Sequence, residues 1–182
     1  MKKMRLGLWA AMMLAVLCLF GCSRTETKSP DVADSIRKSL DQAGLRNISV
    51  AQDRDKGVVT LTGKVAADGD KAKADSIANS MAGGQVVADE IAVLPPGAES
   101  DARTVNTDLD KAIDKNVDAA LIQSGLQKGV RYEVKNGVVT LKGNVNSGSK
   151  RAQVEKVTST VPNVRQVVNE LEVRDQKASS TR

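Results

Sequence analysis

A nine-residue phrase occurs twice in this chain, and it constrains the fold more than any other feature. GVVTLTGKV occupies residues 57–65 and GVVTLKGNV occupies residues 137–145, with seven identical positions. The offset of 80 residues continues without a gap over residues 57–93 and 137–173, where 11 of 37 positions are identical. Upstream the first copy has one extra residue, which a hairpin loop can absorb. The chain therefore contains a duplicated domain.

Each copy has the pattern of a helix, two strands, a second helix and a last strand. Apolar residues recur at helical spacing in the helices and alternate in the strands. The helical stripes are Val32, Ile36, Leu40 and Ala43, then Ala74, Ile77, Ala78 and Met81 in the first copy, and Leu109, Ile113, Val117 and Leu121, then Val154, Val157, Thr158 and Val161 in the second. This order predicts an α+β fold of two tandem αββαβ domains, each with two helices packed on a three-stranded sheet.

Local features add three expectations. Ser29, followed by Pro30, is expected to cap the first helix. Gly63 and Gly143 lie inside strands, where glycine usually marks a bulge or a close approach of two backbones; contact with a ligand is the alternative. The polar segment PPGAESDART, residues 95–104, belongs to neither periodic pattern and is expected to be a spacer.

The first 22 residues have the pattern of a secretory signal. Three basic residues precede an apolar run over residues 6–20, and the small residue Gly21 follows. The run of about 15 residues is shorter than the roughly 20 that a membrane-spanning helix needs. The tetrapeptide LFGC at 19–22 resembles the lipobox of bacterial lipoproteins, which implies acylation of Cys22 and removal of residues 1–21 as a signal peptide.

Acylation would hold the mature chain on a membrane, because three acyl chains exceed what stable anchoring needs. By resemblance to lipoprotein sorting rules, Ser23 implies the outer membrane, with the chain facing the periplasm. Cys18 would leave with the signal, so the mature chain would have neither a free thiol nor a disulfide. The alternative, a Cys18–Cys22 disulfide, requires both cysteines to escape processing. Residues 22–30 would form a lipidated tether and residues 175–182 a disordered tail.

Charge and aromatic content argue against a nucleic-acid partner. The chain has 27 basic and 22 acidic residues, but three of the basic residues lie in the signal, which leaves a net charge of +2. Trp9 and Phe20 also lie in the signal, so Tyr132 is the single aromatic residue of the mature chain. One ring is too few for a protein that stacks bases. We therefore expect no nucleic-acid binding.

Neither a catalytic site nor a metal site is expected. The sequence contains no histidine, and it lacks the GxxxxGK[ST] and GxGxxG phosphate-binding motifs. The stretch DRDKG at 53–57 imitates the start of a calcium loop, but Lys64 stands where that loop needs an acidic residue. The stretch fits a hairpin turn instead. The sequence predicts a binding module that is not an enzyme and uses no cofactor.

Basic residues are concentrated in the second copy. Residues 128–165 contain eight basic and two acidic residues, whereas residues 23–95 contain ten basic and eleven acidic residues. Lys150 and Arg151 fall in the first turn of the expected second helix, where the helix dipole favours anions over cations. A phosphate is therefore a candidate ligand. The candidate headgroup-binding residues are Lys128, Lys142, Lys150, Arg151 and Lys156; the alternative is a solvated charged face.

The order of elements and two motifs resemble the BON domain of Gram-negative envelope proteins. The motifs are GVVTLxGxV on the second strand and the VxNELEV-like last strand, and the resemblance covers residues 31–94 and 107–174, with a linker at 95–106. The first copy departs from the pattern at Gly83 and Gly84, which predicts a looser last turn. A lipid anchor followed by two such domains is similar to the dual-BON outer-membrane lipoproteins. That resemblance implies phospholipid binding and support of envelope integrity.

Two hypotheses of function follow. In the first, the second domain binds anionic phospholipid while the acylated Cys22 anchors the protein. In the second, the paired domains act as a periplasmic chaperone or interaction adaptor, and the edge of the last strand, at residues 167–173, pairs with a strand of an envelope protein. Ionic strength distinguishes the two, because headgroup binding weakens with salt and strand pairing does not.

Overall fold

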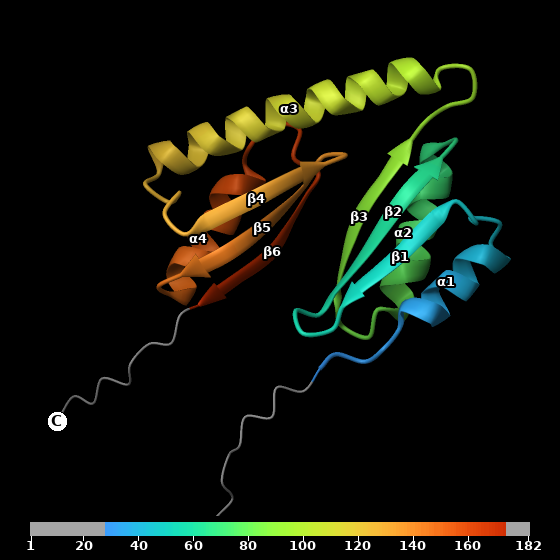
Figure 1. Ribbon diagram of the computed structural model, residues 1–182, viewed down its shortest axis with the longest axis horizontal. Helices are drawn as coiled ribbons and strands as arrows, with labels where there is room; N and C mark the ends of the chain where they lie inside the picture. The colour runs from blue at the N-terminus through green and yellow to red at the C-terminus, as the bar shows by residue number, and fades with distance from the viewer. Residues whose placement is uncertain (1–27, 174–182) are drawn as a thin grey trace, which may run out of the picture.

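The computed structural model describes residues 28–173 (Figure 1). The expected signal peptide at 1–21, with Cys18, lies outside the described residues. The same holds for the acylation site Cys22 and for the expected tail at 175–182. Within the described part of the chain, no helix combines the length and the apolar character that crossing a membrane requires.

Two domains with the same element order follow each other along the chain. Domain 1 consists of α1 (Ala33–Gln42), β1 (Ile48–Asp53), β2 (Val58–Val65), α2 (Asp68–Met81) and β3 (Val86–Val93). Domain 2 consists of α3 (Glu99–Gln123), β4 (Val130–Lys135), β5 (Val138–Val145), α4 (Gly148–Ser159) and β6 (Gln166–Val173). The sheet orders are β1-β2-β3 and β4-β5-β6, with the hairpin pair antiparallel and the last pair parallel. The predicted fold class is confirmed.

Each domain has a core of aliphatic side chains between its helices and one face of its sheet. In domain 1, Ile36 and Leu40 of α1 and Ala74 and Ala78 of α2 are fully buried against the sheet residue Leu61. The equivalent layer of domain 2 is formed by α3, α4 and β5, with its largest fully buried side chains at Ile113, Val117, Leu121, Val139, Leu141, Val145 and Val154. The helical stripes predicted from the apolar spacing therefore face the cores.

Gly63 and Gly143 mark close approaches of two backbones. Their φ angles are +128° and +119°, a region that L side chains rarely adopt. A Cβ at Gly63 would lie 2.2 Å from the backbone oxygen of Asn47, and one at Gly143 would lie 2.4 Å from that of Gly129. The structural expectation for both glycines is confirmed.

The cap predicted for the first helix is wrong. α1 begins at Ala33 after Val32, and no side chain of its own segment caps it. Instead, Gln52 on β1 accepts a hydrogen bond from the Val32 N–H (3.2 Å) and donates one to the Pro30 carbonyl (2.7 Å). The Ser29 N–H donates to the Arg54 carbonyl (2.9 Å), so the segment before α1 lies along β1. α1 therefore starts without a side-chain cap, and Gln52, 20 residues away, holds the segment before it.

The expected linker at 95–106 is also partly wrong, because α3 begins at Glu99. Glu99 and Asp101 lie in its first turn, where negative charge is favourable. The N-terminal part of α3 is largely exposed, so it lacks the apolar stripe that predicts a helix from Leu109 onward. α3 runs across one end of domain 2 and reaches β3 of domain 1 (Figure 1).

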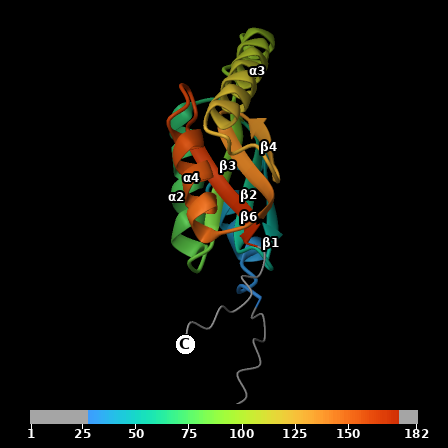
Figure 2. The ribbon, with the colours of Figure 1, turned by 90° about the vertical axis from the view of Figure 1, so that its left-hand side faces the viewer.

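The two domains pack through the sheet faces that their helices leave bare. Val58, Ala88, Val138 and Val168 meet there as one cluster, which we call the seam, and each is only 1–4% exposed. The positions are equivalent in the repeat, 58 with 138 and 88 with 168. With the domains packed in this way, α2 and α4 lie on the same side of the molecule (Figure 2). An approximate twofold axis therefore relates the two sides of the seam.

Two ion pairs flank the seam, and their glutamates occupy equivalent positions in the repeat. Lys56 in the β1–β2 hairpin lies 2.9 Å from Glu170 on β6, and Lys135 at the end of β4 lies 3.0 Å from Glu90 on β3. The glutamate side chains are only 11% and 14% exposed, respectively. The hydrogen bond to Glu170 raises the pKa of Lys56. Each hairpin therefore fixes the last strand of the other domain.

Candidate functional site

Two of the candidate basic residues, Lys128 and Lys150, lie close together near the start of α4. The Lys150 ammonium donates a hydrogen bond to the backbone oxygen of Lys128 (2.9 Å), which places both residues beside the turn before β4. The Lys150 N–H donates to Ser147 Oγ (3.1 Å), so Ser147 caps the helix. The cap occupies one of the N–H groups at this helix start, where the sequence predicts a phosphate.

The other two basic residues of α4 point in different directions. Successive residues on a helix are rotated by about 100°, and Lys156 is two residues from both Val154 and Thr158, which are buried. Lys156 therefore lies on the outer, exposed side. Arg151 lies on the flank next to β6, where its guanidinium donates to the backbone oxygen of Asn169 (3.0 Å).

Lys142 is separated from the other four candidates. It lies on the face of β5 that points away from the helices, because it alternates with the core residue Leu141. Its ammonium is 3.4 Å from Glu133 on the neighbouring strand. The structure therefore brings Lys128 and Lys150 together, places Lys156 on the same helix, and leaves Lys142 on the opposite side of the sheet.

The equivalent helices of the two domains differ in charge. The first turn of α2 contains Asp68 and Asp70, whereas that of α4 contains no acidic residue. Over its whole length α2 has three acidic and two basic residues, and α4 has three basic residues and one acidic residue, Glu155. The basic surface formed by Lys128, Lys150 and Lys156, here called the α4 surface, therefore has no counterpart on domain 1.

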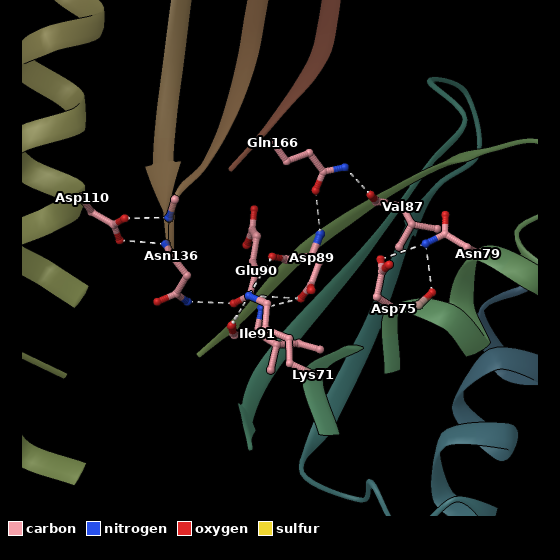
Figure 3. Close-up of polar contacts among 11 residues, drawn as sticks. Lys71, Asp75, Asn79, Val87, Asp89, Glu90, Ile91, Asp110, Asn136 and Gln166 are labelled. Carbon is pink, nitrogen blue, oxygen red and sulfur yellow. Dashed lines mark hydrogen bonds and ion pairs between the residues drawn. The ribbon is translucent and has the colours of Figure 1, made fainter. Parts of the chain in front are cut away.

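The outer edge of β3 is closed by side chains (Figure 3). Gln166 of domain 2 donates to the Val87 oxygen (2.6 Å) and accepts from the Asp89 N–H (3.2 Å). The Ile91 N–H donates to the Asp89 carboxylate (3.1 Å), and the Lys71 ammonium donates to the Ile91 oxygen (2.7 Å). The backbone groups of this edge are thus bound without a partner strand.

Lys71 and Asp89 form a buried pair within that edge. The ammonium is 3.6 Å from the carboxylate, and the two side chains are 7% and 14% exposed. Burial lowers the pKa of Lys71, against the opposing attraction of Asp89. Burial likewise raises the pKa of Asp89. Loss of hydration thus outweighs the mutual attraction for both groups.

The equivalent edge of β6 is largely open. The Leu171 N–H donates to Asn169 Oδ1 (3.2 Å), as the Ile91 N–H does to Asp89 in domain 1. Arg151 donates to the Asn169 backbone oxygen, as Lys71 does to that of Asp89. Val86 stands where the repeat would need a second Gln166. Between residues 28 and 173, no hydrogen bond reaches the Val167 oxygen, the Asn169 N–H or the Leu171 oxygen.

A groove of about 690 Å³ runs along this edge of β6. It is lined by Lys28, Asp55, Lys56, Arg151 and residues 169–173. A different space of about 330 Å³ lies beside β3, and Gln166 and Lys71 line it. The sequence predicts the β6 edge as an interaction surface but not the closing contacts at Gln166, because these join residues 77 and 79 positions apart.

The stretch that imitates a calcium loop is a hairpin turn. Asp53 Oδ1 accepts hydrogen bonds from the N–H groups of Asp55 and Lys56, both at 3.0 Å. Such an Asx turn uses the carboxylate to stabilise the backbone. Within residues 28–173, no cluster of three or more potential metal-ligating side chains occurs.

Comparison with known proteins identifies both repeats. The BON domain family model matches residues 29–95 and 109–175. No curated protein matches the chain. Among solved structures, the chain is similar to CdsD, a structural protein of the type III secretion system of Chlamydia trachomatis. The match to its C-terminal domain has 15% identity and a TM-score of 0.30, and it covers 78% of this chain and 67% of that chain. The match to a second CdsD structure has 17% identity and a TM-score of 0.30, and it covers 79% of this chain and 62% of that chain. Similarity at this level says nothing about what the present chain binds. The two family matches cover most of the sequence, and the chain belongs to the BON domain family.

Proposed function

We propose that this protein is a lipid-anchored component of the outer membrane, facing the periplasm, whose second domain binds anionic phospholipid headgroups through the α4 surface. It would act by binding, without catalysis, in support of envelope integrity. The motif at Cys22 supports the anchor, and membership of the BON family supports a binding role. The observation that carries the proposal is the basic α4 surface, which the equivalent acidic helix of domain 1 lacks.

The geometry favours contact with a charged plane over insertion. Lys128 and Lys156 are exposed, and Lys150 is held beside Lys128 by its hydrogen bond. Each basic residue close to an anionic bilayer contributes about 1 kcal/mol of attraction. Three such residues account for about 3 kcal/mol, or roughly a hundredfold in affinity. The short tether from Cys22 would keep domain 1 near the same lipid surface.

Vesicle binding tests the proposal. Residues 23–182 are sedimented with vesicles of phosphatidylglycerol and phosphatidylcholine, and with phosphatidylcholine alone, at low and physiological salt. We expect binding to the anionic vesicles only, weakened by salt, and lowered roughly a hundredfold by the triple change Lys128→Gln, Lys150→Gln and Lys156→Gln. Lys142→Gln removes one positive charge from the opposite sheet face and serves as the control.

Two results would contradict the proposal. The first is equal binding to neutral and anionic vesicles. The second is a triple variant that binds as tightly as the wild type. In either case the α4 surface would be a solvated face, and the alternative role as a periplasmic chaperone or interaction adaptor would take its place.

A further inference from the structure

We propose that the open edge of β6 is a docking site for an extended polypeptide strand that places an acidic side chain opposite Arg151. This site is separate from the α4 surface. It rests on a difference between two edges that the repeat would make equivalent. The edge of β3 is closed, and that of β6 has unpaired backbone groups beside a groove.

The unpaired groups determine the kind of partner. The Val167 oxygen, the Asn169 N–H and the Leu171 oxygen alternate along one side of the strand, as in any edge strand. A backbone in the β conformation presents donors and acceptors at the matching spacing along the full length of such an edge. The groove of about 690 Å³ provides room for such a backbone beside residues 169–173.

Charge determines which side chain the partner should have. In domain 1, the Lys71 ammonium has the Asp89 carboxylate 3.6 Å away. In domain 2, the equivalent residues are Arg151 and Asn169, so the carboxylate is replaced by an amide. Arg151 forms no salt bridge with any residue in the described part of the chain. An acidic residue on the incoming strand would supply the missing charge, and a guanidinium binds a carboxylate in a bidentate manner.

The test uses a synthetic peptide of eight residues, the length of β6, with alternating threonine and valine and one central glutamate. Its binding to ¹⁵N-labelled residues 23–182 is followed by NMR. We expect the Asn169 amide to shift and to become protected from solvent exchange, while the Asp89 amide, already bound to Gln166, stays unchanged. A peptide with the same side chains but N-methylated at alternate positions should not bind, because it lacks the backbone donors.

A single substitution should close the edge. Val86 is 46% exposed and occupies the position equivalent to Gln166, so Val86→Gln is expected to reach the Val167 oxygen and the Asn169 N–H and to weaken peptide binding at least tenfold. Val86→Thr is the matched control, because its side chain is too short to span both groups. Both changes lie at an exposed position and leave the core intact.

A second comparison tests the charge. Replacing the glutamate of the peptide by glutamine should weaken binding about tenfold in the wild type, and should have no effect in Arg151→Gln. The proposal is overturned if Val86→Gln binds the peptide as well as the wild type does, or if the N-methylated peptide binds equally. It is also overturned if the Asn169 amide is protected without peptide, which would show that a second copy or another segment of this chain already covers the edge.

Discussion

Gly143 offers the sharpest test of the backbone packing, through Gly143→Ala. The new Cβ would lie 2.4 Å from the Gly129 oxygen at a φ of +119°. Backbone strain at such an angle costs about 1–3 kcal/mol, and the clash forces β4 and β5 apart because contacts under 3.0 Å do not persist. We expect a loss of about 3 kcal/mol or more, a large fraction of the roughly 3–10 kcal/mol that a domain of this size has.

The assay uses Tyr132, the single aromatic residue of residues 23–182, which lies in domain 2. Its fluorescence during urea unfolding reports domain 2 directly. With an m-value near 1 kcal/mol/M, the midpoint should fall by about 3 M. Gly148→Ala is the control, since a Cβ there meets nothing within 4 Å and alanine favours a helix. A Gly143→Ala midpoint within about 0.5 M of the Gly148→Ala midpoint would refute the reasoning.

Two further predictions concern ionisation. Burial and the neighbouring carboxylates of Asp114 and Asp118 raise the pKa of Tyr132 to about 12. Ultraviolet titration should show this midpoint, and a midpoint near 10 would contradict the burial. The contribution of the Tyr132 hydroxyl to the free energy of unfolding should be complete below about pH 10. It should be lost as the pH rises through about 12. Asp89→Asn should lower the free energy of unfolding by about 3 kcal/mol, because it leaves the buried Lys71 ammonium without its counter-charge, and should lower the pKa of Lys71 further, measured by NMR titration. A loss below about 1 kcal/mol would show that the ion pair contributes little.

The sequence by itself determined the fold of each domain. The repeated phrase, the apolar spacing and the in-strand glycines are local signals, and Ile36, Leu40 and Gly63 occupy the positions that those signals require. These signals predict the helices and strands because the side-chain directions in both elements repeat within a few residues. The concentration of basic residues in the second copy was equally visible, since it needs only counting.

Only the tertiary structure decided how these parts face one another. It placed Lys142 away from Lys150, bound the segment before α1 to Gln52, and closed the β3 edge with Gln166. The contacts of Gln52 and Gln166 join residues 20 or more positions apart, and that of Gln166 also depends on how the two sheets pack across the seam. The repeat makes the two domains nearly equivalent, so two differences, Val86 against Gln166 and Arg151 against Lys71, leave one sheet edge closed and the other open.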